Sequence, residues 1–398
     1  MVESDPDSHI DEEQDGEPSH GLKITGKEGI GDGAEAQEEQ NSCGGTHCSL
    51  VKDGNVDALD FFTKVKTVFS RACMEPVYPR GYYGTTDNPR GEYAWSMTQV
   101  RVSEEVRDAL SSGGPIVALE STIIAHGLPR PDNLVAARRF EDQIRAAGVT
   151  PATVAVLDGI PTVGLSDAQV ERIATEDVAK ASVRDLPIVM AKGISGATTV
   201  ASTASLASLA GLRVFATGGL GGVHRGANET FDESADLSVL ASTPITVVSA
   251  GVKSILDISA TLERLETLSV PVVGYRTDIF PAFWLSESEY TLDWRVETGA
   301  EVAAIMKARD GLGYRHGIVV ANPVPQDQQW DPTTHDRMLE EALRAASNEG
   351  IRGKEVTPFV LSYIVEHSQG ASLGVNLDLV SHNIAVATDI AKAWSALP

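Results

Sequence analysis

The 398-residue chain carries 56 Asp and Glu against 32 Lys and Arg, a formal net charge of −24 at pH 7. This charge balance argues against a basic surface for a nucleic-acid backbone or for an anionic membrane. No run of residues reaches the roughly 18 apolar side chains that suggest a membrane span. We therefore expect a cytoplasmic protein with neither nucleic acid nor a membrane as a partner.

The first 96 residues differ in composition from the rest of the chain. They hold 19 acidic and 8 basic residues, and residues 1–40 alone hold 13 acids and 2 lysines. Such a segment cannot bury enough apolar surface to offset the entropy of ordering. We predict a mostly disordered acidic extension and linker over 1–96, with no secretory or mitochondrial address, followed by one domain over 97–398.

All cysteines of the chain, Cys43, Cys48 and Cys73, lie in that extension. Three cysteines in a chain of this length make a disulfide framework improbable, and they fit a reducing compartment. The segment from Cys43 to Cys48 could form a metal clip together with His47. The absence of a second ligand pair at zinc spacing makes this the less favoured interpretation.

From residue 97 onward, helical and strand patterns alternate along the chain. Ser103 is the expected N-cap of a helix within 97–110. The expected strands cover 115–119, 152–157, 188–190, 214–216, 245–249, 270–275 and 317–321. The expected helices cover 133–147, 200–210, 253–268, 299–308, 332–349, 357–369 and 377–394. This alternation predicts a three-layer α/β/α fold with a largely parallel sheet, in which ligands gather at the carboxyl ends of the strands.

A glycine-rich stretch over 216–226 follows one of the expected strands. Glycine lets backbone N–H groups approach a ligand closely, so the loop could wrap an anion. The alternative is a turn that merely changes the direction of the chain. The polar residues that follow it, from His224 to Asp236, favour a functional site.

Two residues at expected strand ends have the chemistry of catalytic groups. Lys253 follows the strand 245–249 at the expected start of a helix, where the helix dipole and partial burial would lower its pKa towards that of a nucleophilic amine. The alternative is a surface lysine. Glu120 follows the strand 115–119 and could act as a general acid or base, or could cap the next turn.

Further polar residues suggest a phosphate site and a metal site. Lys180 could pair with a phosphate, and the turn 196–200 could offer the N-terminus of a helix to one. Asn376 adds hydrogen-bonding groups. Asp232 and Asp236 could bind a hard divalent ion, or could be two solvated acids.

Taken together, several long blocks resemble the pseudouridine-5'-phosphate glycosidase family, which includes the IndA-like proteins of the indigoidine cluster. The resemblance covers about 102–396. It rests on VALESTIIAHG at 117–127, GATTVAST at 196–203, the stretch 216–236, SAGVKSILD at 249–257, VANP at 320–323 and GKEVTPF at 353–359. The segment 191–195 departs from the family pattern, and 1–96 has no counterpart in it.

The resemblance implies reversible cleavage of the C–C bond between uracil and ribose 5-phosphate. It implies that Lys253 is the nucleophile and holds a ring-opened sugar adduct, that Glu120 is the proton donor, and that Asp232 binds a divalent ion, typically Mn²⁺. Substrate contacts are implied for Lys180, Val200, His224, Ser234, Ala235, Asp236 and Asn376. The family is trimeric, so a homotrimer is expected, with a separate pseudouridine kinase in the pathway.

Two other functions remain open on the sequence. A Schiff-base lyase or aldolase acting on another phosphosugar would keep Lys253 as its nucleophile. A non-catalytic phosphosugar-binding protein would keep the pocket without the reaction. The covalent role of a lysine is chemically apt for the first hypothesis, because a C-glycoside has no leaving oxygen to protonate and two carboxylates would not suffice.

Overall fold

The computed structural model describes residues 100–352, 356–368 and 371–398. The predicted acidic extension 1–96, its cysteines and the possible metal clip therefore lie outside the described residues, as does the part of the motif 353–359 before residue 356. None of the helices in the described ranges is long and apolar enough to cross a membrane.

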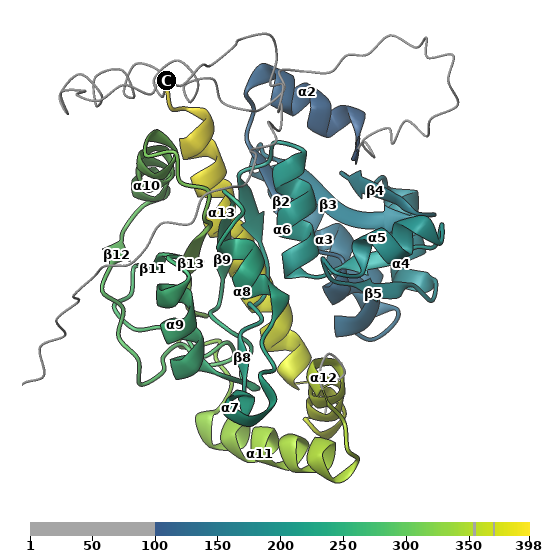
Figure 1. Ribbon diagram of the computed structural model, residues 1–398, viewed down its shortest axis with the longest axis vertical. Helices are drawn as coiled ribbons and strands as arrows, with labels where there is room; N and C mark the ends of the chain where they lie inside the picture. The colour runs from purple at the N-terminus through teal and green to yellow at the C-terminus, as the bar shows by residue number, and fades with distance from the viewer. Residues whose placement is uncertain (1–99, 353–355, 369–370) are drawn as a thin grey trace, which may run out of the picture. The chain divides into compact units, whose positions relative to one another are not determined.

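The described chain forms a mostly parallel mixed sheet with helices packed on it (Figure 1). Its strands are β1 Arg101–Val102, β2 Ile116–Leu119, β3 Thr150–Leu157, β4 Ile160–Val163, β5 Ala179–Ala181, β6 Gly196–Thr198, β7 Val214–Ala216, β9 Thr246–Ser249, β11 Val272–Tyr275, β12 Arg295–Val296 and β13 Ile318–Ala321. The main order is β1-β4-β3-β2-β7-β9-β13-β11-β12, with β5 and β6 joined beside β3. A separate antiparallel pair consists of β8 Val223–His224 and β10 Leu256–Asp257.

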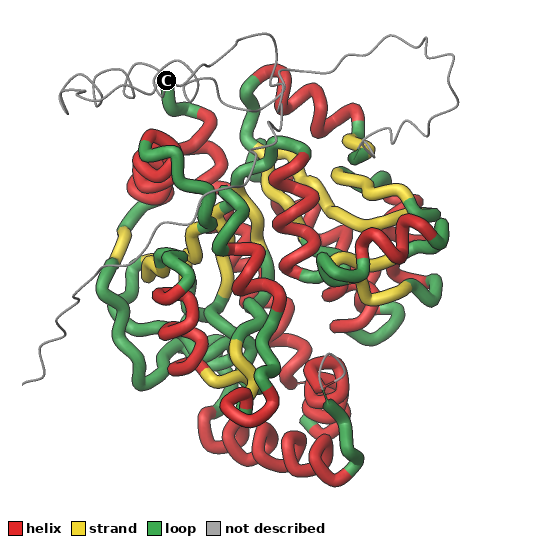
Figure 2. The backbone as a smooth tube through the Cα atoms, viewed as in Figure 1, coloured by secondary structure: helices red, strands yellow, loops and turns green. Residues whose placement is uncertain are grey.

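Helices and strands alternate along the chain, as Figure 2 shows. The helices are α2 Glu104–Ser112, α3 Asp132–Ala146, α4 Asp167–Thr175, α5 Leu186–Ala191, α6 Val200–Leu209, α7 Ala227–Thr230, α8 Ala235–Leu240, α9 Ile258–Thr267, α10 Gly299–Gly311, α11 Pro332–Asn348, α12 Val356–His367 and α13 Ala371–Ser395, with a π-helical turn at Ile123–Gly127. The long α13 packs on β2, β7 and β9, and α12 packs on both α11 and α13.

The central strands have the composition of a sheet that is covered on both faces. Every residue of β2, β7, β9 and β13 is buried. Their β-branched and small apolar side chains form continuous runs rather than alternating patterns, which is typical of parallel strands between helices. These strands run parallel to their neighbours, so their carboxyl ends meet at one edge. The predicted α/β fold with a largely parallel sheet is confirmed.

Three local predictions need correction. The expected strand 188–190 lies in α5, where Leu186 and Val189 are buried and Ile188 is exposed, a helical spacing that a three-residue apolar run could not reveal. The helix expected from residue 97 starts at residue 104, after β1, although Ser103 does cap it by accepting a hydrogen bond from the Val106 N–H. The helix expected from residue 253 starts at residue 258.

Gly251, in the turn after β9, is a position that the fold reserves for glycine. Its φ is +85°, and a Cβ there would collide with the carbonyl oxygen of Pro281. We predict that Gly251→Ala lowers the free energy of unfolding by about 1–3 kcal/mol, since strained backbone costs about that much. Urea unfolding measures this change. Gly374→Ala in α13, where a Cβ meets open space, should be neutral or slightly stabilising; equal losses in both variants would contradict the prediction.

Candidate active site

A cavity of ≈ 350 Å³ lies where β2, β7 and β9 deliver their loops. This volume falls within the range of small-molecule sites. The residues that the sequence singled out all line it, namely Glu120, Lys180, Val200, His224, Asp232, Ser234, Ala235, Asp236, Lys253 and Asn376. They come from segments up to 256 positions apart. Their meeting in one cavity follows from the common edge at which parallel strands end.

Glu120 is buried directly after β2 and is held by two hydroxyl groups. The hydroxyls of Thr122 and Thr217 donate to different oxygens of its carboxyl group. Thr217 follows β7, so the neighbouring strand fixes the position of the carboxyl group. Hydrogen bonds of this kind offset the cost of burying a polar group. Glu120 can therefore hold or accept a proton from one fixed place in the cavity wall.

The turn that carries Thr217 is itself fixed by the C-terminal helix. The amide Nδ2 of Asn383, in α13, donates to the carbonyl oxygens of Thr217 at 2.7 Å and Gly218 at 3.3 Å. Its Oδ1 accepts a hydrogen bond from Asn322, which follows β13. Asn383, Asn322 and Thr217 are all buried. A connected buried network of this kind favours a single arrangement of the site.

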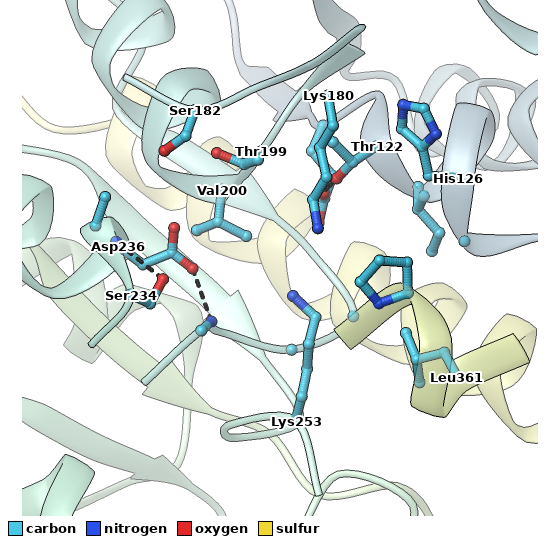
Figure 3. A pocket seen from close by; sticks show the side chains of 18 of the residues that line it. Thr122, His126, Lys180, Ser182, Thr199, Val200, Ser234, Asp236, Lys253 and Leu361 are labelled. Atoms are coloured by element: carbon cyan, nitrogen blue, oxygen red, sulfur yellow. Dashed lines mark hydrogen bonds between the residues drawn. The ribbon is translucent and has the colours of Figure 1, made fainter. Parts of the chain in front are cut away.

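Lys253 lies in the loop between β9 and β10, five residues before α9 begins. The predicted effect of a helix dipole on its amine is therefore wrong. Its backbone is anchored by a hydrogen bond from its N–H to the carbonyl oxygen of Leu220. Figure 3 shows the side chains of Lys253 and Lys180 entering the cavity from opposite sides, with both Nζ atoms in its central part. Within the described residues, the Lys253 Nζ forms no ion pair or protein hydrogen bond.

The charges of Lys180, Lys253 and Asp232 all act on the pKa of His224. Its pKa is lowered chiefly by burial, and the positive charges of Lys180 and Lys253 lower it further. The carboxylate of Asp232, 3.9 Å from the His224 Nδ1, partly opposes this effect. The cavity therefore favours a neutral imidazole at neutral pH.

The glycine-rich loop after β7 serves mainly as a packing surface for protein groups. A Cβ on Gly219 would lie 2.6 Å from the ring of Phe283, and one on Gly221 would lie 2.7 Å from a carboxylate oxygen of Asp236. The Gly221 N–H donates to the Asp236 Oδ2 at 2.7 Å, and the Leu220 N–H donates to the carbonyl oxygen of Gly251. These two donors are thus committed to the protein and are not available to wrap an anion; the predicted anion site stays a prediction for the Gly218 and Gly219 N–H groups, whose residues also line the cavity.

Asp236 joins this loop to the start of α6. Its Oδ1 accepts a hydrogen bond from the Ala201 N–H at 2.9 Å, while its Oδ2 accepts from Gly221. Backbone N–H groups thus satisfy both oxygens of this buried carboxyl group. Asp236 shapes the cavity through these bonds, and Figure 3 shows it beside Ser234 on the wall that also carries Val200.

The cavity lining combines two kinds of side chain. Hydroxyl groups and cations come from Lys180, Ser182, Arg184 and Thr199, and Thr199 is the residue that precedes α6. Apolar side chains come from Ile123, Leu128, Leu256, Phe283 and Leu361. A cavity of this kind suits a ligand with an anionic group and a flat, less polar part. Ser182 and Arg184 were not predicted from the sequence as site residues, although they follow Lys180 by two and four positions on the same short segment.

The donor set near Asp232 suits a hard cation that keeps most of its water. No three His, Cys, Asp or Glu side chains of the described ranges form a cluster that could cage a metal ion. Asp236, the other carboxylate considered as a ligand, is committed to backbone N–H groups. Asp232 is one-third exposed at the cavity, and one carboxylate with water and substrate oxygens is an arrangement that Mg²⁺-like ions accept.

Comparison with known families supports a common origin for this arrangement. The family model described as "Indigoidine synthase A like protein" matches residues 105–393. A Frankia alni protein named pseudouridine-5'-phosphate glycosidase is 61% identical over 300 residues, which are 75% of this chain and 83% of that protein. A Saccharopolyspora erythraea protein of the same name is 57% identical over 295 residues, 74% of this chain and 97% of that one.

Two solved structures share the fold. The prealnumycin C-glycosynthase AlnA, in complex with ribulose 5-phosphate, superimposes with a TM-score of 0.69 at 36% identity and covers 74% of this chain and 97% of its own. An indigoidine synthase A-like protein from Thermotoga maritima gives a TM-score of 0.67 at 36% identity with the same coverage.

The charges around His224 lead to a prediction about its titration. In metal-free buffer its pKa should lie below the ordinary value of about 6.5. Asp232→Asn should lower this pKa further, because it removes the charge that raises it, and Lys180→Met should raise it. An NMR titration of the ring protons measures both changes; shifts of the same sign in the two variants would contradict the proposed electrostatics. The unfolded chain binds this proton more readily, because folding lowers the pKa of His224. The free energy of unfolding should therefore fall as the pH drops from about 6.5 through the lower pKa of the folded chain.

Proposed function

The chain belongs to the indigoidine synthase A-like family, and from this premise we propose that it cleaves the C–C glycosidic bond of pseudouridine 5'-phosphate to give uracil and ribose 5-phosphate. The observation that carries the proposal is the meeting of Glu120, Lys253 and Lys180 in one cavity. Relatives named pseudouridine-5'-phosphate glycosidase, at up to 61% identity, support the substrate. The neighbour AlnA, a C-glycosynthase bound to ribulose 5-phosphate, supports C-glycoside chemistry on a phosphosugar.

In the proposed reaction, the neutral amine of Lys253 attacks C1' of the sugar. The Nζ–C1' bond forms, the C1'–O4' bond breaks, and O4' takes the proton that the amine gives up. Glu120 then donates a proton to C5 of the base. The C1'–C5 bond breaks, its electrons restore the uracil ring, and the Nζ lone pair forms a protonated imine with C1'.

Hydrolysis of the imine completes the cycle. Water adds to C1' and gives one proton to the Glu120 carboxylate. The second proton of that water passes to Nζ as the Nζ–C1' bond breaks, so ribose 5-phosphate leaves as the open aldehyde and both residues regain their starting states. Lys180 and Lys253 enter the same cavity from opposite sides, so Lys180 can supply positive charge to the phosphosugar that Lys253 attacks.

The remaining groups of the cavity bind and orient the substrate. Lys180 and the hydroxyl groups beside Val200 suit the 5'-phosphate, as do Ser234 and the backbone of Ala235. Asp232 would hold a divalent ion such as Mn²⁺, which would supply positive charge for substrate oxygens when bound. The neutral imidazole of His224 can donate or accept one hydrogen bond.

The assembly and the cellular setting are further parts of this proposal. A homotrimer, a separate kinase that supplies pseudouridine 5'-phosphate and a cytoplasmic location are the expectations that accompany the family. The alternative function, a Schiff-base lyase or aldolase on another phosphosugar, shares the lysine and the phosphate contacts. It differs in the substrate that turns over.

The first experiment is to measure uracil release from pseudouridine 5'-phosphate with Mn²⁺, with and without a chelator. Lys253→Ala should lower kcat by at least about 10³-fold because it removes the nucleophile. Lys192→Ala, an exposed lysine outside the cavity, is the matched control. Borohydride should trap the sugar on the intact protein and not on Lys253→Ala.

The outcomes of this experiment separate the hypotheses. Turnover that survives in Lys253→Ala would remove this residue from the covalent role. Absence of turnover in the intact, folded and metal-loaded protein would contradict the proposed substrate. In that case a sugar adduct trapped on Lys253 from another phosphosugar would favour the lyase.

The hydroxyls around Glu120 give a second prediction for this reaction. Glu120→Gln should lower kcat by about 10²–10⁴-fold, the usual contribution of a general acid or base. Thr217→Val should lower kcat less, about three- to tenfold, because it removes one hydrogen bond that orients the carboxyl group. Thr267→Val, on the exposed surface of α9, is the control. A Thr217→Val enzyme with the kcat of the control would refute the orienting role.

A further inference from the structure

A hydrogen bond between two side chains fixes one wall of the cavity and has no role in the steps above. The indole Nε1 of Trp284 donates to the Oδ1 of Asn376 at 2.6 Å. Trp284 is fully buried, and Asn376 lies near the start of α13 at the cavity wall. The two residues are 92 positions apart in the sequence.

This bond determines which end of the Asn376 amide faces the ligand. An indole nitrogen can only donate a hydrogen bond, so its partner must be the amide oxygen. The Nδ2 group has no acceptor among the described protein residues. Asn376 therefore has two N–H donors at the cavity wall that no described protein group uses, while its Oδ1 is engaged by the indole.

The indole is held in place by aromatic neighbours. The Trp284 ring meets the ring of Trp330 edge-on at 5.5 Å and that of His335 at 5.9 Å, and it lies 5.1 Å from Phe283. Its backbone carbonyl accepts a hydrogen bond from the Trp330 N–H at 3.0 Å. Edge-to-face packing of this kind restricts the ring to one orientation. A ligand that binds to a fixed donor loses less binding free energy to side-chain ordering, because the rotamer of that donor is already set.

We propose that Trp284 is a positioning residue that locks Asn376 as a hydrogen-bond donor to an acceptor oxygen of the substrate. The inference rests on the proposed function. Both halves of pseudouridine 5'-phosphate carry acceptor oxygens, namely the carbonyls of the base and the hydroxyl and phosphate oxygens of the ribose 5-phosphate. An amide free to rotate could accept from a base N–H instead, so the lock also sets which atom the site recognises.

The test compares Trp284→Phe with Trp330→Phe. Both variants remove an indole from the same aromatic cluster, but only the first removes the donor to Asn376. Trp284→Phe should raise KM for pseudouridine 5'-phosphate about five- to tenfold with a smaller change in kcat, as expected for one lost hydrogen bond to the substrate. Trp330→Phe should leave KM within about twofold. Equal KM values in the two variants would overturn the proposal.

A double-mutant cycle shows whether Trp284 acts through Asn376. Asn376→Ala should raise KM at least as much as Trp284→Phe. Adding Trp284→Phe to Asn376→Ala should then change KM by less than about twofold, because the group that it positions is absent. Effects that multiply would show that Trp284 acts by another route and would overturn the proposal.

The synthetic direction shows which half of the substrate carries the acceptor oxygen. If Asn376 contacts the ribose 5-phosphate, Trp284→Phe should raise KM for ribose 5-phosphate and leave KM for uracil unchanged. If it contacts the base, the reverse should hold. Either single change supports the proposal; a change in neither, or an equal change in both, would contradict a specific contact.

A measurement without turnover separates this inference from the proposed function. The indole N–H signal of Trp284, assigned in a ¹H–¹⁵N spectrum through its loss in Trp284→Phe, should shift in Asn376→Ala. An unmoved signal would overturn the hydrogen bond whatever the reaction. Absence of turnover by the intact protein, with the shift observed, would instead refute the proposed substrate and leave the locked amide in place.

Discussion

The lack of space around the turn after β7 is the constraint on which the site depends. Side chains from three separate segments approach the backbone of this turn so closely that a Cβ could not be added at Gly219, Gly221 or Gly222. The ring of Phe283, the Ser234–Asp236 segment and Thr261 occupy that space. Phe283, Ser234 and Asp236 also line the cavity, so their contacts with the turn set the positions of other cavity walls. The absence of a Cβ at these glycines lets the neighbouring segments pack directly on the turn, because a close-packed interior has no room for the extra atom.

Buried polar groups add specificity to this packing. Asp236 ties the turn to α6, and Asn383 ties it to α13. An unsatisfied buried group costs about 1–3 kcal/mol, so an alternative arrangement that broke these bonds would be disfavoured. The same network ends at Thr217, whose hydroxyl bonds to Glu120. The packing of α13 thus helps to fix Glu120, which moves a proton in the proposed reaction, through Asn383 and Thr217.

Lysine and aspartate side chains surround a histidine in the cavity. Lys180 and Lys253 reach it from different segments, and their charges together with burial keep His224 neutral. The nucleophile and the second cation of the proposed reaction thus come from two segments and meet only in the folded chain.

The sequence alone determined the fold class, the strands that matter and the residues to consider. Apolar runs bounded by polar loops predicted β2, β7, β9 and β13, and the polar residues after them predicted Glu120 and Lys253 as members of a site. These features are local, and buried strands must show them wherever they occur. The family resemblance added the reaction class.

The tertiary structure decided what no local pattern records. The strand expected at 188–190 is part of a helix, and Lys253 lies in a loop rather than at a helix end. The use of loop N–H groups by the protein itself became visible only once distant side chains were in place. The same is true of the contact between Trp284 and Asn376, which depends on bringing together two segments 92 residues apart. Burial, hydrogen-bond partners and the orientation of an amide are properties of such encounters, and a linear sequence does not contain them.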